Sequence, residues 1–202
     1  CYMFKDYFAN LFLHQSDVSF NIHNNSMEVH HKRAEPWTVT LVDTGDHSMT
    51  GGRLRRVSEY VKNEDAFCFT YGDGISDINI SKLIKFHKDH GKDATLTATY
   101  SPGRFGALDI KDKKILQFSE KPKGDGSWIN GGFFVCKPEV FETIDGDFTI
   151  FEKDPHTSLA RANQLMAFNH EGFWKAMDTL KDKKDLNELW RLNKAPWKNW
   201  DD

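Results

Sequence analysis

A short apolar run ends in a carboxylate between two glycines at Ala66-Phe67-Cys68-Phe69-Thr70-Tyr71-Gly72-Asp73-Gly74. Because the run is rich in aromatic residues and closed by turn residues, it predicts a buried β-strand. Open α/β sheets bind ligands at the carboxyl ends of their strands, where Asp73 would hold a metal ion against phosphate oxygens. An ordinary Asp-Gly turn explains the same peptide equally well, so other parts of the chain must decide.

Alternating helix and strand patterns lie on both sides of this run. Apolar spacing predicts helices over about 3–14, 54–61, 81–90, 159–163 and 179–192, and strands at 18–22, 27–29, 37–42, 94–100, 105–110, 115–118, 128–135 and 165–168. The order strand, helix, strand in the middle of the chain implies parallel pairing through right-handed crossovers. No helix separates the strands between 105 and 135, so we expect an antiparallel annex over the sheet edge. The sequence therefore predicts one α/β domain with a β annex.

The composition describes a globular protein and excludes several classes of function. The chain has 202 residues, of which 39% are hydrophobic, and a formal net charge of -3, which argues against a general nucleic-acid binder. No apolar run approaches the roughly 20 residues that span a bilayer. Of the three cysteines, Cys68 and Cys136 lie in apolar strand patterns. We expect them to be buried free thiols, which are typical of a reducing, cytoplasmic setting.

Asp178 is a second candidate metal ligand. It precedes the last predicted helix, where the commonest role of an aspartate is to cap the helix N-terminus. If it instead meets Asp73, the two carboxylates together with substrate phosphates would satisfy Mg²⁺. The spacing of the two residues along the chain favours neither interpretation.

Three further segments carry polar residues suited to ligands. Glu120-Lys121-Pro122 is either a solvated charge pair before a proline turn or a contact for sugar hydroxyls and a phosphate. Asn130-Gly131-Gly132 interrupts an apolar strand, which often marks close approach by a ligand or another backbone. Thr50-Gly51-Gly52 opens a helix and is suited to an anion, and Arg53 behind it is either an exposed helix residue or a nucleotide contact. No nucleophile elbow, P-loop or Rossmann glycine fingerprint is present.

Taken together, these segments resemble the sugar-1-phosphate nucleotidylyltransferases along essentially the whole chain. The motifs that carry the resemblance are Met49-Thr50-Gly51-Gly52-Arg53, Phe69-Thr70-Tyr71-Gly72-Asp73-Gly74, Glu120-Lys121-Pro122, Ile129-Asn130-Gly131-Gly132 and Met177-Asp178-Thr179-Leu180. The Thr-Gly-Gly-Arg segment, the early hairpin and the tryptophan-rich tail are typical of the branch that uses CTP. The resemblance implies a Rossmann-like nucleotide-diphospho-sugar transferase fold with a mixed sheet flanked by helices. It also implies transfer of CMP from CTP to glucose 1-phosphate, giving CDP-glucose and pyrophosphate, for surface polysaccharide.

The resemblance implies roles for individual residues as well. Asp73 and Asp178 would hold Mg²⁺, and Asp73 and Lys121 would be the catalytic residues. The remaining assignments are Ser48, Arg53 and Gly72 for the nucleotide, and Glu120, Lys121, Asn130 and Gly131 for the sugar phosphate. The family further implies a homo-oligomer, whereas the charge, the absence of a long apolar run and the cysteines predict a cytoplasmic protein without nucleic-acid or membrane partners. We expect residues 1–202 to be one catalytic domain and residues 18–44 to be the hairpin region that joins subunits.

The chain departs from the family at its beginning. Members begin with a βαβ unit whose glycine-rich Gly-x-Gly-Thr-Arg loop and following lysine hold the triphosphate, and none of this precedes Cys1. If the chain is a fragment, we expect little or no turnover and a sheet edge that invites association. The alternatives are a sugar nucleotidylyltransferase of other base specificity and an inactive fragment that serves only in assembly. A nucleotide-sugar glycosyltransferase is a further rival, but Asp73 and Asp77 do not have the spacing of its Asp-x-Asp motif.

Overall fold

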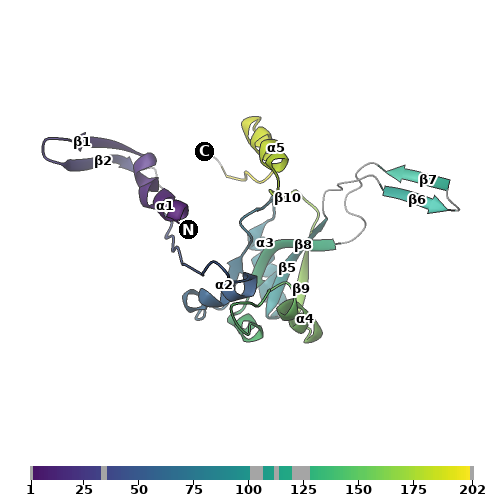
Figure 1. The fold of residues 1–202 in the computed structure, drawn as a ribbon. Helices are drawn as coiled ribbons and strands as arrows, with labels where there is room; N and C mark the ends of the chain where they lie inside the picture. The colour runs from purple at the N-terminus through teal and green to yellow at the C-terminus, as the bar shows by residue number, and fades with distance from the viewer. Residues whose placement is uncertain (1, 33–35, 101–106, 112–113, 120–127, 201–202) are drawn as a thin grey trace. The chain divides into compact units, whose positions relative to one another are not determined.

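The computed structural model describes residues 2–32, 36–100, 107–111, 114–119 and 128–200. The chain divides into two compact units, Cys1–Asp46 and His47–Asp202. Figure 1 shows both units and labels most of their helices and strands. Of the helices in the described residues, none is long and apolar enough to cross a membrane.

The first unit consists of a helix and a β-hairpin. Its elements are α1 (Tyr2–His14), β1 (Ser16–Asn21) and β2 (Ser26–Lys32). The two strands pair antiparallel with Val18 opposite Val29, which confirms the predicted helix and hairpin. The strand predicted at 37–42 is wrong, because that segment contains no regular secondary structure. An alternating pattern makes a segment suitable for a sheet but does not supply the partner strand that it needs.

The second unit is built on a four-stranded mixed sheet (Figure 1). In spatial order its strands are β3 (Phe67–Phe69), β8 (Trp128–Cys136), β5 (Ala94–Tyr100) and β9 (Leu165–His170). Strand β8 runs antiparallel to both of its neighbours, whereas β5 and β9 are parallel. The prediction of a mixed sheet within an α/β unit is therefore confirmed.

Strand β8 lies elsewhere than predicted. We expected it in the annex, with β3 and β5 paired directly, but β8 lies between these two strands. Its middle and carboxyl-terminal part is largely buried, as is usual for a strand covered on both faces. The apolar run correctly predicted a strand, but a one-strand pattern carries no information about which neighbours the strand will have.

Helices α3 (Ile80–His90) and α4 (Asp154–Arg161) of the second unit pack against the sheet. The same unit contains α2 (Thr50–Arg56) and α5 (Leu180–Arg191), with short 3-10 helices at Ser58–Tyr60 and Pro138–Thr143. Helix α3 begins where the Asn79 side chain accepts a hydrogen bond from the Lys82 N–H, and it ends at Gly91 in the left-handed conformation, as predicted. It packs against β5, β8 and β9.

The main core lies between the sheet and the helices near its β3 side. Buried Phe134 of β8 stacks on Phe69 of β3 with ring centroids 4.4 Å apart, and Phe151 and Leu159 pack into the same cluster. Cys136 is also fully buried there, and burial raises the pKa of its thiol. Cys68 is exposed on β3, so the prediction that both thiols are buried is wrong for this residue. Alternate residues of a strand point to opposite faces, and Cys68 lies between two core phenylalanines.

Two small ladders complete the described structure. Strands β6 (Ala107–Lys111) and β7 (Lys114–Ser119) form an antiparallel hairpin, as expected for the annex. Strands β4 (Gly74–Ser76) and β10 (Trp174–Ala176) pair antiparallel with each other. Because β4 follows the Asp73 turn and β10 precedes Asp178, this second ladder positions the two candidate metal ligands.

A buried histidine relay joins α3 to β5. The Lys92 N–H donates to His90 Nδ1 (2.9 Å), so His90 Nε2 carries the proton and donates to Thr95 Oγ1 (2.7 Å). The Thr95 hydroxyl then donates to His87 Nδ1 (2.9 Å). This order leaves the proton of His87 on Nε2, which is buried and finds no partner among the described residues.

The relay predicts an acid-sensitive fold. Burial, together with the charges of His90 and Lys137, lowers the pKa of His87 to about 4. The unfolded chain binds this proton at a pKa of about 6.5, so stability is complete above that pH and is lost as the pH falls toward 4. We expect the free energy of unfolding to fall by about 2 kcal/mol between pH 8 and pH 5 through this residue. Urea unfolding of the wild type and of His87→Gln at both pH values measures the difference, and equal pH dependence in the two proteins would contradict the assignment.

Candidate active site

The β4–β10 ladder brings Asp73 and Asp178 to the same end of two adjacent strands. Gly74 pairs with Ala176, and the Met177 N–H donates to the Asp73 carbonyl oxygen at 2.9 Å. Asp73 therefore lies opposite Met177, and Asp178 is the next residue along the second strand. Both aspartates are exposed. The ladder thus brings the main chain at the two aspartates together, and their joint role as metal ligands stays a prediction.

Asp178 does not cap the following helix. The cap is Thr179, whose Oγ1 accepts a hydrogen bond from the Asp182 N–H (3.2 Å) while Asp182 Oδ2 accepts one from the Thr179 N–H (3.0 Å). This reciprocal capping box satisfies the first turn of α5 without Asp178. Lys175 of β10 also pairs with Asp182 (3.3 Å), so the strand before Asp178 and the helix after it are joined.

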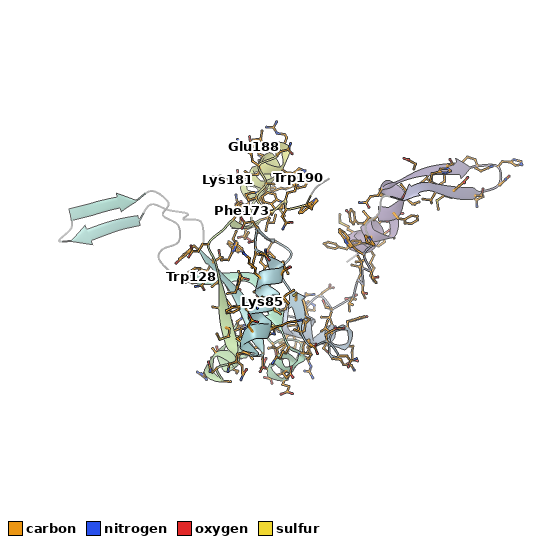
Figure 2. All side chains as sticks on the ribbon, turned by 180° about the vertical axis from the view of Figure 1, so that it is seen from behind. Lys85, Trp128, Phe173, Lys181, Glu188 and Trp190 are labelled. Carbon is orange, nitrogen blue, oxygen red and sulfur yellow. The ribbon has the colours of Figure 1, made fainter. Side chains whose placement is uncertain are left out.

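A polar cluster holds the other end of the ladder. Asp77 Oδ1 accepts a hydrogen bond from the Phe173 N–H (2.8 Å) and lies 2.9 Å from His170 Nε2, and Ser76 Oγ donates to the Phe173 carbonyl (2.8 Å). Figure 2 labels Phe173 in this turn between β9 and β10. Although serine, histidine and aspartate meet here, Ser76 and Asp77 both face the same nitrogen of His170. A nucleophilic triad needs the two ring nitrogens to have different partners, so this cluster fixes a turn.

The sugar-side segment adjoins the ladder. The indole N–H of Trp174 in β10 donates to the Gly131 carbonyl in β8 (2.7 Å), and Asn130 Oδ1 accepts from the Gly132 N–H (2.9 Å). Gly132 has a positive φ of 79° at an irregularity in the β5–β8 pairing. The glycines predicted to mark a close approach thus lie beside Trp174 and under Tyr71, whose ring would be 2.5 Å from a Cβ at Gly132.

The nucleotide segment is packed against the loop before α4. Ser48 is buried, and the N–H groups of Gly51 and Gly52 both donate to the Thr149 carbonyl oxygen (2.9 and 3.3 Å). These two groups are therefore not available to an anion, contrary to the role expected for a glycine-rich helix start. Both glycines are required by close packing, since a Cβ at Gly52 would lie 2.2 Å from the Asp147 carbonyl oxygen.

The other residues predicted to bind the nucleotide or the sugar phosphate are Arg53, Gly72, Glu120 and Lys121. Arg53 is exposed on α2, whereas Arg56, three residues further along the same helix, holds Asp147 in a bidentate ion pair. Gly72 has open space where a Cβ would be, with nothing within 4 Å. Glu120 and Lys121 lie outside the described residues.

A carboxylate that the sequence did not indicate connects these segments. Glu152 accepts hydrogen bonds from Thr50 Oγ1 (2.6 Å) and from the Tyr71 hydroxyl, and thus touches both the nucleotide segment and the residue two before Asp73. It lies in a turn between Phe151 and Lys153 with no recognisable motif. No spacing rule could have found it, because its partners come from distant parts of the chain.

The donor set suits Mg²⁺. Among the described residues no group of three or more histidine, cysteine, aspartate or glutamate side chains could hold a metal ion without further ligands. Two neighbouring carboxylates are what Mg²⁺ takes from a protein when substrate phosphates and water supply the other oxygen ligands. Zinc-type chemistry would need histidine or cysteine ligands, which the Asp73–Asp178 pair lacks.

The fold and this site define a class of protein, and comparison with known proteins identifies it. A profile of the nucleotidyl transferase family matches residues 9–200. The chain belongs to the nucleotidyl transferase family. It is similar to the glucose-1-phosphate cytidylyltransferases of Salmonella typhimurium and Salmonella typhi, each 62% identical over 200 residues, which cover 99% of this chain and 78% of each relative. The predicted resemblance is confirmed.

A solved structure supports the fold independently. A Bacillus anthracis protein assigned as a glucose-1-phosphate thymidylyltransferase matches 78% of this chain and 65% of its own chain with a TM-score of 0.55. At 20% sequence identity this likeness shows the fold alone. It confirms the predicted mixed α/β nucleotidyltransferase fold.

Proposed function

We propose that this protein transfers CMP from CTP to glucose 1-phosphate, giving CDP-glucose and pyrophosphate. The observation that carries the proposal is the β4–β10 ladder, in which the Met177 N–H donates to the Asp73 carbonyl oxygen and so brings the main chain at Asp73 next to that at Asp178. The 62% identity to two glucose-1-phosphate cytidylyltransferases supports the choice of nucleotide and sugar.

The reaction requires the substrates to be aligned and their charge to be balanced. A phosphate oxygen of glucose 1-phosphate forms a bond to the α-phosphorus of CTP, and the bond from that phosphorus to the β-phosphate oxygen breaks. Asp73 and Asp178 would hold Mg²⁺, which when bound neutralises charge on the phosphates. Such chemistry asks a protein mainly for positioning and electrostatic stabilisation, which fixed strand ends provide.

The remaining residues form two sides around this pair. Ser48, Arg53 and Gly72 would contact the nucleotide, and the open space at Gly72 lets a ligand approach the main chain. Asn130 and Gly131 would contact the sugar phosphate together with Glu120 and Lys121. In this assignment Lys121 is catalytic because its positive charge would stabilise the negative charge of the attacking phosphate.

We also propose that residues 1–202 act as one catalytic domain within a cytoplasmic homo-oligomer. The region 18–44 would join the subunits, since Phe20, Ile22 and Met27 of the hairpin are exposed large apolar side chains. The free thiols of Cys68 and Cys136 support a reducing compartment.

A direct assay tests the reaction. The purified protein is incubated with Mg²⁺, glucose 1-phosphate and one of CTP, UTP, dTTP or GTP, and pyrophosphate release is measured. We expect release with CTP at a rate at least about tenfold above that with the other nucleotides. A parallel sample carries the glycine-rich N-terminal unit of the family joined before Cys1, so that triphosphate binding does not limit the result. Preference for another base in both samples would overturn the proposal.

A further inference from the structure

Glu152 connects two segments that the proposed reaction needs to keep at a fixed distance. Its Oε2 accepts a hydrogen bond from Thr50 Oγ1 at 2.6 Å, and its Oε1 accepts one from the Tyr71 hydroxyl. Thr50 belongs to the nucleotide segment, and Tyr71 is followed by Gly72 and Asp73. One half-buried carboxylate therefore joins the nucleotide side of the site to its metal side.

The Thr50 side of this connection is rigid. Thr50 is the first residue of α2, and its Oγ1 also accepts a hydrogen bond from the Phe151 N–H at 2.9 Å. The hydroxyl thus donates one hydrogen bond and accepts another, and both partners are adjacent residues of the same turn. Together with the Gly51 N–H bond to Thr149, it fixes the start of α2 on the turn that carries Glu152.

The Tyr71 side is also fixed. The ring packs edge-on against Phe134 of the core, with centroids 5.8 Å apart, and covers Gly132 so closely that no side chain would fit there. The hydroxyl of this ring donates its hydrogen bond to Glu152 Oε1. A shift of Glu152 would have to move this ring.

The charge of Glu152 strengthens both bonds. Burial opposes ionisation, but the hydrogen bonds from Thr50 and Tyr71 outweigh it and hold the pKa of Glu152 below its usual value. Hydrogen bonds to an ionised acceptor are shorter and about twice as strong as neutral ones. Glutamine at this position would have the same size and no charge.

We propose that Glu152 is a positioning residue, which sets the distance between the nucleotide segment at 48–53 and the strand end at 71–73. It does not touch the reacting atoms, and it acts through Thr50 and Tyr71. This proposal rests on the proposed function, because the distance matters for a triphosphate that spans both segments. Loss of the connection should raise the KM for CTP and lower kcat together.

Steady-state kinetics of Glu152→Gln test the proposal. We expect kcat/KM for CTP to fall by about 30-fold, and we expect Glu188→Gln, an exposed glutamate of α5 paired with Arg191 (Figure 2), to leave it unchanged. Tyr71→Phe should cost several-fold in the wild type and almost nothing in the Glu152→Gln protein. Thr50→Val should cost less in the Glu152→Gln protein than in the wild type, although in both it also removes the acceptor of the Phe151 N–H. Thr50→Ser, which keeps the hydroxyl, should restore most of the activity. Equal costs in both backgrounds would overturn the proposal.

Hydrogen exchange gives a readout that needs no turnover. In Glu152→Gln we expect amide exchange to accelerate in peptides covering 48–53 and 71–74, and to stay unchanged in a peptide covering 87–95. The opposite outcome is a Glu152→Gln protein that unfolds more easily while its kinetic constants and its exchange at both segments stay unchanged. That outcome would overturn the proposal, because Glu152 would then contribute only to stability. If neither the wild type nor the sample that carries the N-terminal unit turns over CTP, the proposed function fails, and the exchange result still decides whether Glu152 fixes the two segments.

Discussion

Asp73→Asn is expected to lower kcat/KM by at least about 100-fold, a loss of roughly 3 kcal/mol of transition-state stabilisation. The carboxylate is exposed, so its replacement by the equally large amide should leave the free energy of unfolding within about 0.5 kcal/mol of the wild type. The metal requirement is measured as the binding of CDP-glucose at increasing Mg²⁺, followed by calorimetry. We expect the variant to lose the Mg²⁺-dependent part of this binding.

Two further variants make the experiment specific. Asp178→Asn should have a similar effect, and the double variant should be little worse than either single one, because both carboxylates hold one ion. Asp89→Asn serves as a control, since this exposed aspartate of α3 only pairs with Lys85. Normal binding of CDP-glucose and Mg²⁺ by Asp73→Asn would mean that the metal role is wrong.

Gly52→Ala is expected to reduce the free energy of unfolding by about 3 kcal/mol or more, as overpacking against an immovable group does. The new Cβ would lie 2.2 Å from the Asp147 carbonyl oxygen and 2.5 Å from its Cα. Both neighbours are main-chain atoms, which cannot rotate away as a side chain would. Urea unfolding measures the loss.

Gly72→Ala is the matched control for this substitution. A Cβ at Gly72 meets nothing within 4 Å, so we expect a change of less than about 0.5 kcal/mol in the free energy of unfolding. If the nucleotide approaches the main chain there, the same variant raises the KM for CTP several-fold. Equal stability of the Gly52 and Gly72 variants would show that the contact with Asp147 relaxes at little cost.

Elements with strong local signals were predictable from the sequence. The apolar spacing of α1 and α3, and Gly91 as the end of α3, each reflect interactions within a few residues. Sheet neighbours were not predictable, because the partner of a strand lies far away in the chain. Strand β8 was therefore placed in the annex although it occupies the centre of the sheet.

In the candidate site, too, local motifs were predictable from the sequence and contacts between distant segments were not. The motifs around Asp73 and Asp178 were found because the resemblance to a family marks them. Their adjacency was beyond the sequence, because β4 and β10 are only three residues long and too short for an alternating pattern. Glu152 was missed for a related reason, since its two partners are 102 and 81 positions away.

The Met177–Asp73 bond has a consequence for how this site can change. Because the main chain sets the separation of the two carboxylates, side chains around them are open to wide replacement. The number of residues that join each aspartate to its strand, in contrast, cannot change. One residue inserted between Asp73 and Gly74, or between Ala176 and Asp178, would move one aspartate a step along the chain relative to the other. The metal pair is therefore tolerant of altered neighbours and intolerant of altered register.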